Sequence, residues 1–442
     1  MDTQLQVDHQ FVDAPQSPNG QPGIIVRALL KIGGTAPQHA NRPPIGLSFV
    51  IDRSGSMSGN RIEAARVAAA RAVERLHPDD VVSVVAFDDH IETIAPPERR
   101  ARQHNLVHAL LQLDTRGSTN LSGGWLRGRE HMQHAQGLIG SLPGSSRRIL
   151  LLTDGHANMG ITEPSTLVEL ARTARSMGIT TTTVGVGDGY DDTLLRAMAD
   201  AGGGNAWYIE RPDQSDDVLA EELGNLLSVC AQGLTVKLAL DEAVTLVVMH
   251  SDWPTMTPAT GTFLFDLGDL YAAEPKPLLL ELFVPVERLE LLKTDVTPIA
   301  TMSVSADVIT AAGGVEHRVS HLPIASSLEG QQQMVPDIEM AVLLAHAAKA
   351  REEAARLQRA GEAESAERIM REASAQFRKS AEGTSMDSAL LLRDAEEFDT
   401  LAEQYSRRTF SELEAKYQMQ RSYNARRGKQ SYDEKLRRKR DE

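Results

Sequence analysis

The stretch that decides the fold of this chain reads Phe49-Val50-Ile51-Asp52-Arg53-Ser54-Gly55-Ser56-Met57-Ser58-Gly59. An apolar run from Ile45 to Ile51 predicts a buried strand, and a helical pattern begins at Arg61. The residues between them are rich in Asp, Ser and Gly, which predicts a tight loop. The stretch therefore predicts a strand-loop-helix unit whose oxygen atoms lie at the carboxyl end of the strand, where ligands bind in open α/β sheets.

The side chains of this loop and of two later loops predict a metal site. Asp52, Ser54 and Ser56 offer one carboxylate and two hydroxyls at alternate positions. Thr119 adds a hydroxyl in a Gly-Ser-Thr-Asn loop, and Asp154 ends a second apolar strand. Hard oxygen ligands of this kind suit Mg²⁺, Ca²⁺ or Mn²⁺ better than zinc. The alternative for the first loop is an ordinary turn with a capping Asp and solvated serines.

These five residues, in this order and spacing, resemble the metal-ion-dependent adhesion site (MIDAS) of the von Willebrand factor A (VWA) family. The resemblance covers about residues 43–233. It implies that Ser54 and Ser56 ligate the ion directly and that Thr119 joins them in the ligand-bound state. It also implies that Asp52 and Asp154 bind the ion either directly or through water.

With only two carboxylates, a divalent ion stays electropositive and short of one ligand, so an Asp or Glu side chain of a partner protein can bind it. We therefore expect a metal-dependent protein-recognition module and not an enzyme. The alternative is a metal-dependent hydrolase or phosphatase, for which Arg53 and His156 are the nearest candidate residues. We expect Arg53 to be solvated and His156 simply to follow the Asp-Gly turn, which favours recognition.

Composition restricts the class of protein. The formal net charge is −15, which argues against general nucleic-acid binding. Cys230 is the only cysteine, which excludes an internal disulfide framework and a cysteine-based zinc cluster. No apolar run reaches the roughly 20 residues of a membrane-spanning helix, and residues 1–22 lack the apolar core of a secretory signal. We expect a cytoplasmic protein without membrane insertion, whose oligomeric state the sequence leaves open.

Strand and helix patterns alternate from Ile45 to about Gly233, which predicts a doubly wound, mostly parallel α/β sheet. Strand patterns dominate before and after it, and predict a β-sandwich into which the α/β domain is inserted. This layout resembles that of integrin β subunits and of bacterial multi-domain VWA proteins. The predicted parts are a mobile amino terminus (1–22), a first sandwich strand and linker (23–42), the VWA domain (43–233), the β-sandwich (234–325), a helical hairpin and further helix (335–417) and a charged basic tail (418–442).

Two further segments have a bearing on function. The glycine-rich stretch from Val184 to Asp191 lacks the Gly-x-Gly-x-x-Gly order of a nucleotide loop, so we expect Asp188 and Asp191 to serve as turn and helix-capping residues. The predicted helix over 213–231 runs directly into the β-sandwich, and its movement could transmit a change in the metal shell. We expect the basic tail to be solvated and not to bind nucleic acid.

Overall fold

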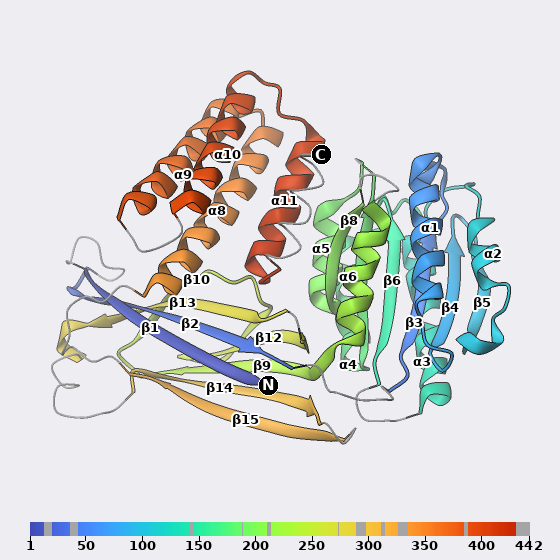
Figure 1. Cartoon of the computed structure of the whole chain (residues 1–442), viewed down its shortest axis with the longest axis horizontal. Helices are drawn as coiled ribbons and strands as arrows, with labels where there is room; N and C mark the ends of the chain where they lie inside the picture. Colours follow the sequence, from blue (N-terminus) through green and yellow to red (C-terminus); the bar gives the residue numbers. More distant parts are fainter. Residues whose placement is uncertain are drawn as a thin grey trace.

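The computed structural model describes residues 1–12, 20–35, 43–140, 145–187, 189–209, 214–272, 274–288, 298–310, 314–325, 335–383 and 388–429. Figure 1 shows three parts: an α/β domain, a pair of β-sheets beside it, and a group of helices that lies above the β-sheets with α11 next to the α/β domain. Among the described residues, no helix is both long and apolar enough to cross a bilayer.

The α/β domain is built on a six-stranded sheet in the order β5-β4-β3-β6-β7-β8. All neighbouring strands are parallel except β5, which pairs antiparallel with β4 at one edge. The interior strands β3 and β4 are buried at every residue, as expected for a sheet covered on both faces. The strands are β3 (Gly46–Asp52), β4 (Val81–Phe87), β5 (Ile91–Arg99), β6 (Arg147–Thr153), β7 (Ile179–Val186) and β8 (Gly203–Ile209).

Helices cover both faces of this sheet and form a separate hydrophobic core on each. Phe49 and Ile51 of β3 face the core under α1, α2 and α6, whereas Val50 faces the core under α3, α4 and α5. The alternation follows from the two-residue period of a strand. The helices are α1 (Asn60–Glu74), α2 (Leu106–Leu111), α3 (Leu121–Ile139), α4 (Pro164–Ser176), α5 (Asp192–Gly202) and α6 (Ser215–Leu227).

The β part consists of a four-stranded sheet, β1-β2-β13-β10, and a five-stranded sheet, β11-β12-β9-β14-β15. Both are antiparallel, and their inner faces share one hydrophobic core, in which Val26 and Leu280 of the first sheet join Val236 and Val304 of the second. The strands are β1 (Asp2–Val12), β2 (Gly23–Gly33), β9 (Val229–Leu240), β10 (Thr245–Met249), β11 (Thr255–Ala259), β12 (Thr262–Tyr271), β13 (Lys276–Pro285), β14 (Ala300–Ile309) and β15 (Val315–Ile324).

The amino-terminal segment differs from the prediction of a mobile end. Residues 2–12 form β1, which pairs antiparallel with β2 along its whole length. An edge strand buries only one face, so Leu5 and Val7 suffice to pack it against the core. Asp8 is buried and pairs with Arg27 at 2.6 Å, which fixes the strand further.

The helical region contains α8 (Pro336–Arg359), α9 (Ala363–Gly383), α10 (Ser388–Ser406) and α11 (Glu412–Arg426). The predicted further helix is interrupted between Ser406 and Glu412, where Arg408 adopts a positive φ of 55°. The predicted basic tail is also wrong in its first part: residues 418–426 belong to α11, and Gln418, Gln420 and Arg421 are buried. The rest of that tail, 430–442, lies outside the described residues.

A buried ion pair joins the α/β domain to the β part. Arg148 of β6 is fully buried, and its guanidinium donates to Glu222 of α6 at 2.5 Å and to the Tyr271 hydroxyl of β12 at 2.7 Å. Burial by itself would raise the pKa of the Glu222 carboxyl, but Arg148 and donors from Asn205 and Trp207 hold that pKa below its usual value. Glu222 is therefore an ionised centre that α6, β6 and β8 share.

Replacing Arg148 should destabilise the whole chain. In Arg148→Met the Glu222 carboxylate stays buried without its counter-charge, so we expect the free energy of unfolding to fall by about 3–5 kcal/mol. The exposed pair of Arg172 with Glu169, 3.0 Å apart, provides the control. Arg172→Met should change stability by less than about 1 kcal/mol. Urea unfolding followed by circular dichroism measures both, and equal effects would contradict the assigned role of the buried pair.

Candidate metal centre

The five predicted ligands lie on three loops at one edge of the α/β sheet. Asp52 ends β3, with Ser54 and Ser56 in the loop that follows, and Asp154 comes directly after β6. Because β3 and β6 are parallel neighbours, their carboxyl ends lie side by side. Thr119 lies in the loop before α3.

Hydrogen bonds hold the three loops together. The Gly55 amide donates to the Gly117 carbonyl at 3.1 Å, which joins the serine loop to the Thr119 loop. The Thr119 amide donates to the Asn158 side chain at 2.8 Å, and the Thr119 carbonyl accepts from the Asn158 amide at 3.2 Å. The Thr119 loop is thereby also fixed to the loop of Asp154. Asn158 was not among the predicted site residues, and the only signal for it in the sequence is its place four residues after Asp154.

Within the serine loop, the donor atoms converge. The Ser54 and Ser56 hydroxyl oxygens lie 3.0 Å apart, and the Ser54 amide donates to Asp52 Oδ1 at 2.8 Å. Thr153, a second residue that the sequence analysis missed, donates its hydroxyl to Asp52 Oδ2 at 2.5 Å. Ser54 is buried, whereas Ser56 is exposed, so the group opens to solvent at Ser56. Asp52 is thus oriented on both of its oxygens, and the two serine hydroxyls lie beside it.

The two carboxylates carry an electrostatic cost. Burial and, to a smaller extent, the charge of Asp154 raise the pKa of Asp52 to about 6, although hydrogen bonds from Thr153 and Ser54 oppose the rise. Asp154 is also fully buried, and its Oδ2 atom has no hydrogen-bond donor among the described residues. The nearest cation is Arg61, whose Nη1 lies 3.8 Å from that oxygen and donates to the Ser56 carbonyl.

This donor set fits a hard divalent cation. A buried carboxylate oxygen without a donor is unfavourable, and a bound cation would both ligate Asp154 and offset its repulsion with Asp52. Two carboxylates and three hydroxyls are the oxygen ligands that Mg²⁺, Mn²⁺ and Ca²⁺ prefer. The residues that could hold the ion are Asp52, Ser54, Ser56, Thr119 and Asp154.

Arg53 is buried, which corrects the prediction that it is solvated. Its guanidinium pairs with Asp88 and with Glu92, each at 2.7 Å, and Arg116 of the Thr119 loop also pairs with Asp88 at 2.8 Å. Burial would raise the pKa of Asp88, but the His90 amide and the two guanidinium groups lower it to about 2. Asp88 follows β4, so its ion pairs with both arginines hold the serine loop and the Thr119 loop against the neighbouring strand end.

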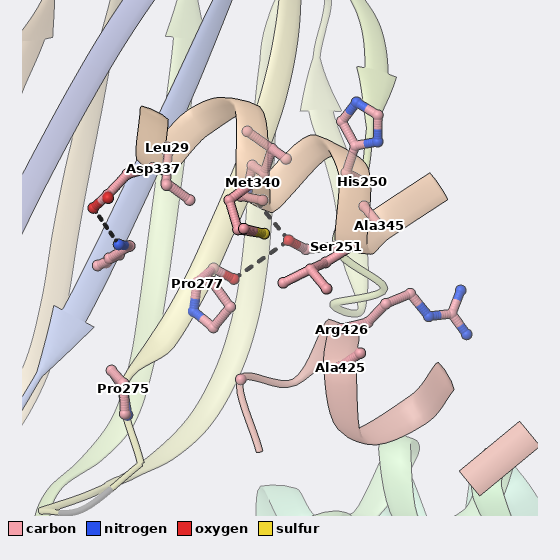
Figure 2. Close-up of a pocket in the computed structure, with 15 residues that line it drawn as sticks. Leu29, His250, Ser251, Pro275, Pro277, Asp337, Met340, Ala345, Ala425 and Arg426 are labelled. Atoms are coloured by element: carbon pink, nitrogen blue, oxygen red, sulfur yellow. Dashed lines mark hydrogen bonds and ion pairs between the residues drawn. The ribbon is translucent and has the colours of Figure 1, made fainter. Parts of the chain in front are cut away.

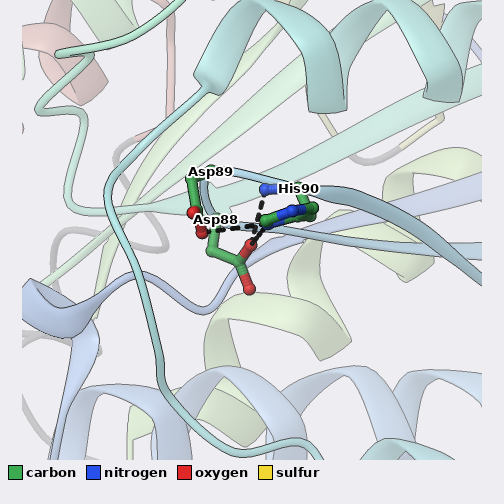
Figure 3. Close-up of side chains that lie close together, drawn as sticks. All are labelled: Asp88, Asp89 and His90. Carbon is green, nitrogen blue, oxygen red and sulfur yellow. Dashed lines mark hydrogen bonds and ion pairs between the residues drawn. The ribbon is translucent and has the colours of Figure 1, made fainter.

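A second group of possible ligands, Asp88, Asp89 and His90, lies in the turn between β4 and β5 (Figure 3). The His90 ring nitrogen lies 3.3 Å from Asp89 and 3.8 Å from Asp88. Both oxygens of Asp88 already accept hydrogen bonds, one from the arginines and the other from the His90 amide at 2.6 Å. This turn is therefore a charged support for the loops, and it fits a cation less well than the group around Asp52.

A cavity of about 290 Å³ lies between the four-stranded sheet, α8 and the end of α11 (Figure 2). Leu29, Leu279 and Met340 give it a largely apolar lining. Its charged side chains have partners: Lys31 pairs with Asp337 at 2.7 Å, and Arg426 pairs with Asp252 and Glu352. The cavity is thus chemically unlike the oxygen-rich centre, and it shares no residue with that centre.

The glycine-rich turn between β7 and α5 forms a further wall of the centre. The Asp191 amide donates to the Asp154 carbonyl at 3.0 Å, and the His156 ring nitrogen lies 2.5 Å from the Gly189 carbonyl. The Asp191 side chain accepts from the Leu194 amide at 3.0 Å, so its predicted role as a helix cap is confirmed. Asp188 lies outside the described residues.

Comparison with known proteins agrees with this fold. The family model described as the von Willebrand factor type A domain matches residues 47–221. YfbK of Escherichia coli strain K12, an uncharacterized protein, is 29% identical over 221 residues, which are 49% of this chain and 38% of YfbK. Human inter-alpha-trypsin inhibitor heavy chain H3 is 29% identical over 198 residues, which are 43% of this chain and 22% of that protein. The chain therefore matches less than half of the length of these relatives.

Two solved structures resemble nearly the whole chain. A von Willebrand factor type A protein from Catenulispora acidiphila has a TM-score of 0.62 and 17% identity, and the match covers 91% of this chain and 96% of that one. The ArnB paralog VWA2 from Sulfolobus acidocaldarius has a TM-score of 0.53 and 16% identity, with 96% and 98% covered. At these identities the likeness concerns the fold. The family match shows a von Willebrand factor type A domain over residues 47–221 of this chain.

Proposed function

We propose that the VWA domain is a metal-dependent protein-recognition module. A divalent cation, Mg²⁺ or in its place Ca²⁺ or Mn²⁺, binds Asp52, Ser54, Ser56, Thr119 and Asp154, and then accepts an Asp or Glu side chain from a partner protein. The observation that carries the proposal is the buried Asp154 Oδ2 atom, which finds no hydrogen-bond donor in the described part of the chain and lies beside a second buried carboxylate. VWA domains commonly mediate protein interactions, and the family match supports this class of function.

The charge of the chain favours a metal-mediated contact with an acidic partner. A formal net charge of −15 repels an acidic protein at long range. A divalent ion held by two carboxylates and neutral hydroxyls supplies a local site for an anion. Ser56, the exposed member of the five, marks the side from which a partner side chain can reach the ion.

The contacts of Arg53 and His156 support recognition over the hydrolase or phosphatase alternative. A metal-dependent phosphoryl transfer needs a cation or acid aimed at the developing charge. Arg53 is held by Asp88 and Glu92 below the surface, and the His156 ring contacts the Gly189 carbonyl. The two candidates for catalysis are thus engaged in holding the loops. We propose a non-enzymatic role on this ground.

Asp154→Asn should separate metal binding from folding. The carboxamide keeps the size of the side chain and removes one of two repelling charges, so we expect the metal-free variant to be at least as stable as the wild type. At a Mg²⁺ concentration of 100 times Kd, the wild type should gain about 2.7 kcal/mol of stability, and the variant should gain little. Urea unfolding with and without Mg²⁺ measures both.

Asp89→Asn is the matched control for this substitution. Asp89 is exposed and belongs to the group in the β4–β5 turn. This variant should keep the Mg²⁺-dependent gain of the wild type. A loss of that gain in Asp89→Asn, with retention in Asp154→Asn, would move the metal site to the turn and contradict the proposal.

Partner binding should require both the ion and the Thr119 hydroxyl. We expect immobilised wild-type chain to retain a protein from a lysate of its source organism in Mg²⁺ and to release it on addition of EDTA. Thr119→Ala should lose the partner, Thr119→Ser should keep it, and the neighbouring exposed Ser118→Ala should have no effect. Mass spectrometry of the eluates identifies the protein retained by the wild type and by each of the three variants. A partner that remains bound in EDTA would count against metal-mediated recognition.

A further inference from the structure

Helix α11 is polar, yet it is buried between the VWA domain and the other helices (Figure 1). Lys416, Gln420 and Asn424 have exposed fractions of 3%, 3% and 0%. Burying an amine or an amide is costly unless it is bound, so the contacts of these side chains show what the helix recognises. The contacts of Lys416 are with the turn between β7 and α5, which forms one wall of the candidate metal centre.

Lys416 contacts this turn directly. Its ammonium donates to the Tyr190 carbonyl at 2.7 Å and lies 4.5 Å from the centre of the Tyr190 ring. The same ring stacks on Tyr208 of β8, with 4.9 Å between the ring centres. Hydrogen bonding, a cation–π contact and ring stacking together fix the position of Tyr190.

Tyr190 adjoins the residue that contacts the candidate ligand. The amide of Asp191, the next residue, donates to the carbonyl of Asp154 at 3.0 Å. Gly155 has a φ of +76°, and a Cβ atom there would lie 3.1 Å from the Asp191 amide nitrogen, so the two loops are in close contact. A displacement of the turn must therefore displace Asp154.

Further contacts attach α11 to both of its neighbours. On the VWA side, the Gln420 amide donates to the Ala206 carbonyl at 3.0 Å, and the Tyr423 hydroxyl donates to Asp200 at 3.2 Å. On the helical side, Arg421 pairs with Glu397 of α10, and Arg426 pairs with Glu352 of α8. The helix thus connects the wall of the centre with the helical region.

We infer that Lys416 is a positioning residue for the metal centre, and that α11 couples occupancy of the centre to the helical region. The inference rests on the proposed function. Lys416 holds Tyr190, the turn holds the Asp154 backbone, and Asp154 supplies a charged ligand. Because coupling between two sites is reciprocal, an ion that fixes Asp154 also stabilises the contacts between α11 and the turn at Tyr190.

The first experiment measures the Mn²⁺ dissociation constant of the full chain by isothermal titration calorimetry. Lys416→Met keeps most of the length of the side chain and removes the ammonium. We expect about tenfold weaker binding, because changing a group that supports a metal ligand typically weakens metal affinity by about 10- to 100-fold. Gln418→Met is the control, because Gln418 is equally buried on the same helix but donates to Glu414 of that helix at 2.8 Å. Its Mn²⁺ affinity should equal that of the wild type.

The second experiment uses the wild-type chain alone, so it decides the matter even if Lys416→Met fails to fold. Amide hydrogen exchange with and without Mn²⁺ should show slower exchange in α11 when the ion is bound, and no change in β14 and β15, which lie in the far sheet. Unchanged exchange in α11, or equal Mn²⁺ affinities of Lys416→Met and the wild type, overturns this inference alone. A wild-type chain that binds no Mn²⁺ overturns the proposed function and this inference with it.

Discussion

The parallel pairing of β3 with β6 is the constraint on which the candidate metal centre depends. It brings Asp52 and the Asp154 loop to one edge of the sheet, although the two aspartates are about a hundred residues apart in the chain. Both carboxylates are buried there, and burial raises the pKa of Asp52. The fold thus places two buried carboxylates at one edge of the sheet, where only the Arg61 guanidinium, 3.8 Å from Asp154 Oδ2, offsets their charge among the described residues. This arrangement is more readily understood as a prepared binding site than as a contribution to stability.

Buried ion pairs fix the geometry of the sheet edge that carries the candidate metal centre. Arg53 and Arg116 bind Asp88, so the serine loop and the Thr119 loop are fixed to the end of β4. At the opposite end of β6, Arg148 and Glu222 form a buried pair that reaches the β part through Tyr271. The central strands are therefore fixed by charged groups at both ends, while their apolar faces are covered by helices. The loops of the centre are supported as parts of a rigid domain.

The position of α11 gives the helical region a structural relation to the centre. From the sequence, the helix predicted over 213–231 was the segment that could transmit a change in the metal shell. The structure has α6 there, which is fixed by the Arg148–Glu222 pair and packs under the sheet, whereas residues 229–231 belong to β9. By contrast, α11 contacts the turn that adjoins Asp154, through Lys416 and Tyr190. The contacts therefore favour α11 as the connection between the centre and the rest of the molecule.

The sequence by itself determined the alternation of strands and helices and the five candidate ligands, because both follow from local periodicity and from side-chain chemistry at strand ends. It did not reveal strand β1, because apolar residues such as Leu5 and Val7 alternate there with polar ones and the segment as a whole is polar. It also did not reveal the burial of α11, because polar side chains are expected to be solvated until their buried partners are known. Arg53, Thr153, Asn158 and Lys416 were misjudged or missed for the same reason. Their roles depend on groups supplied by distant segments, and only the tertiary structure decides which groups those are.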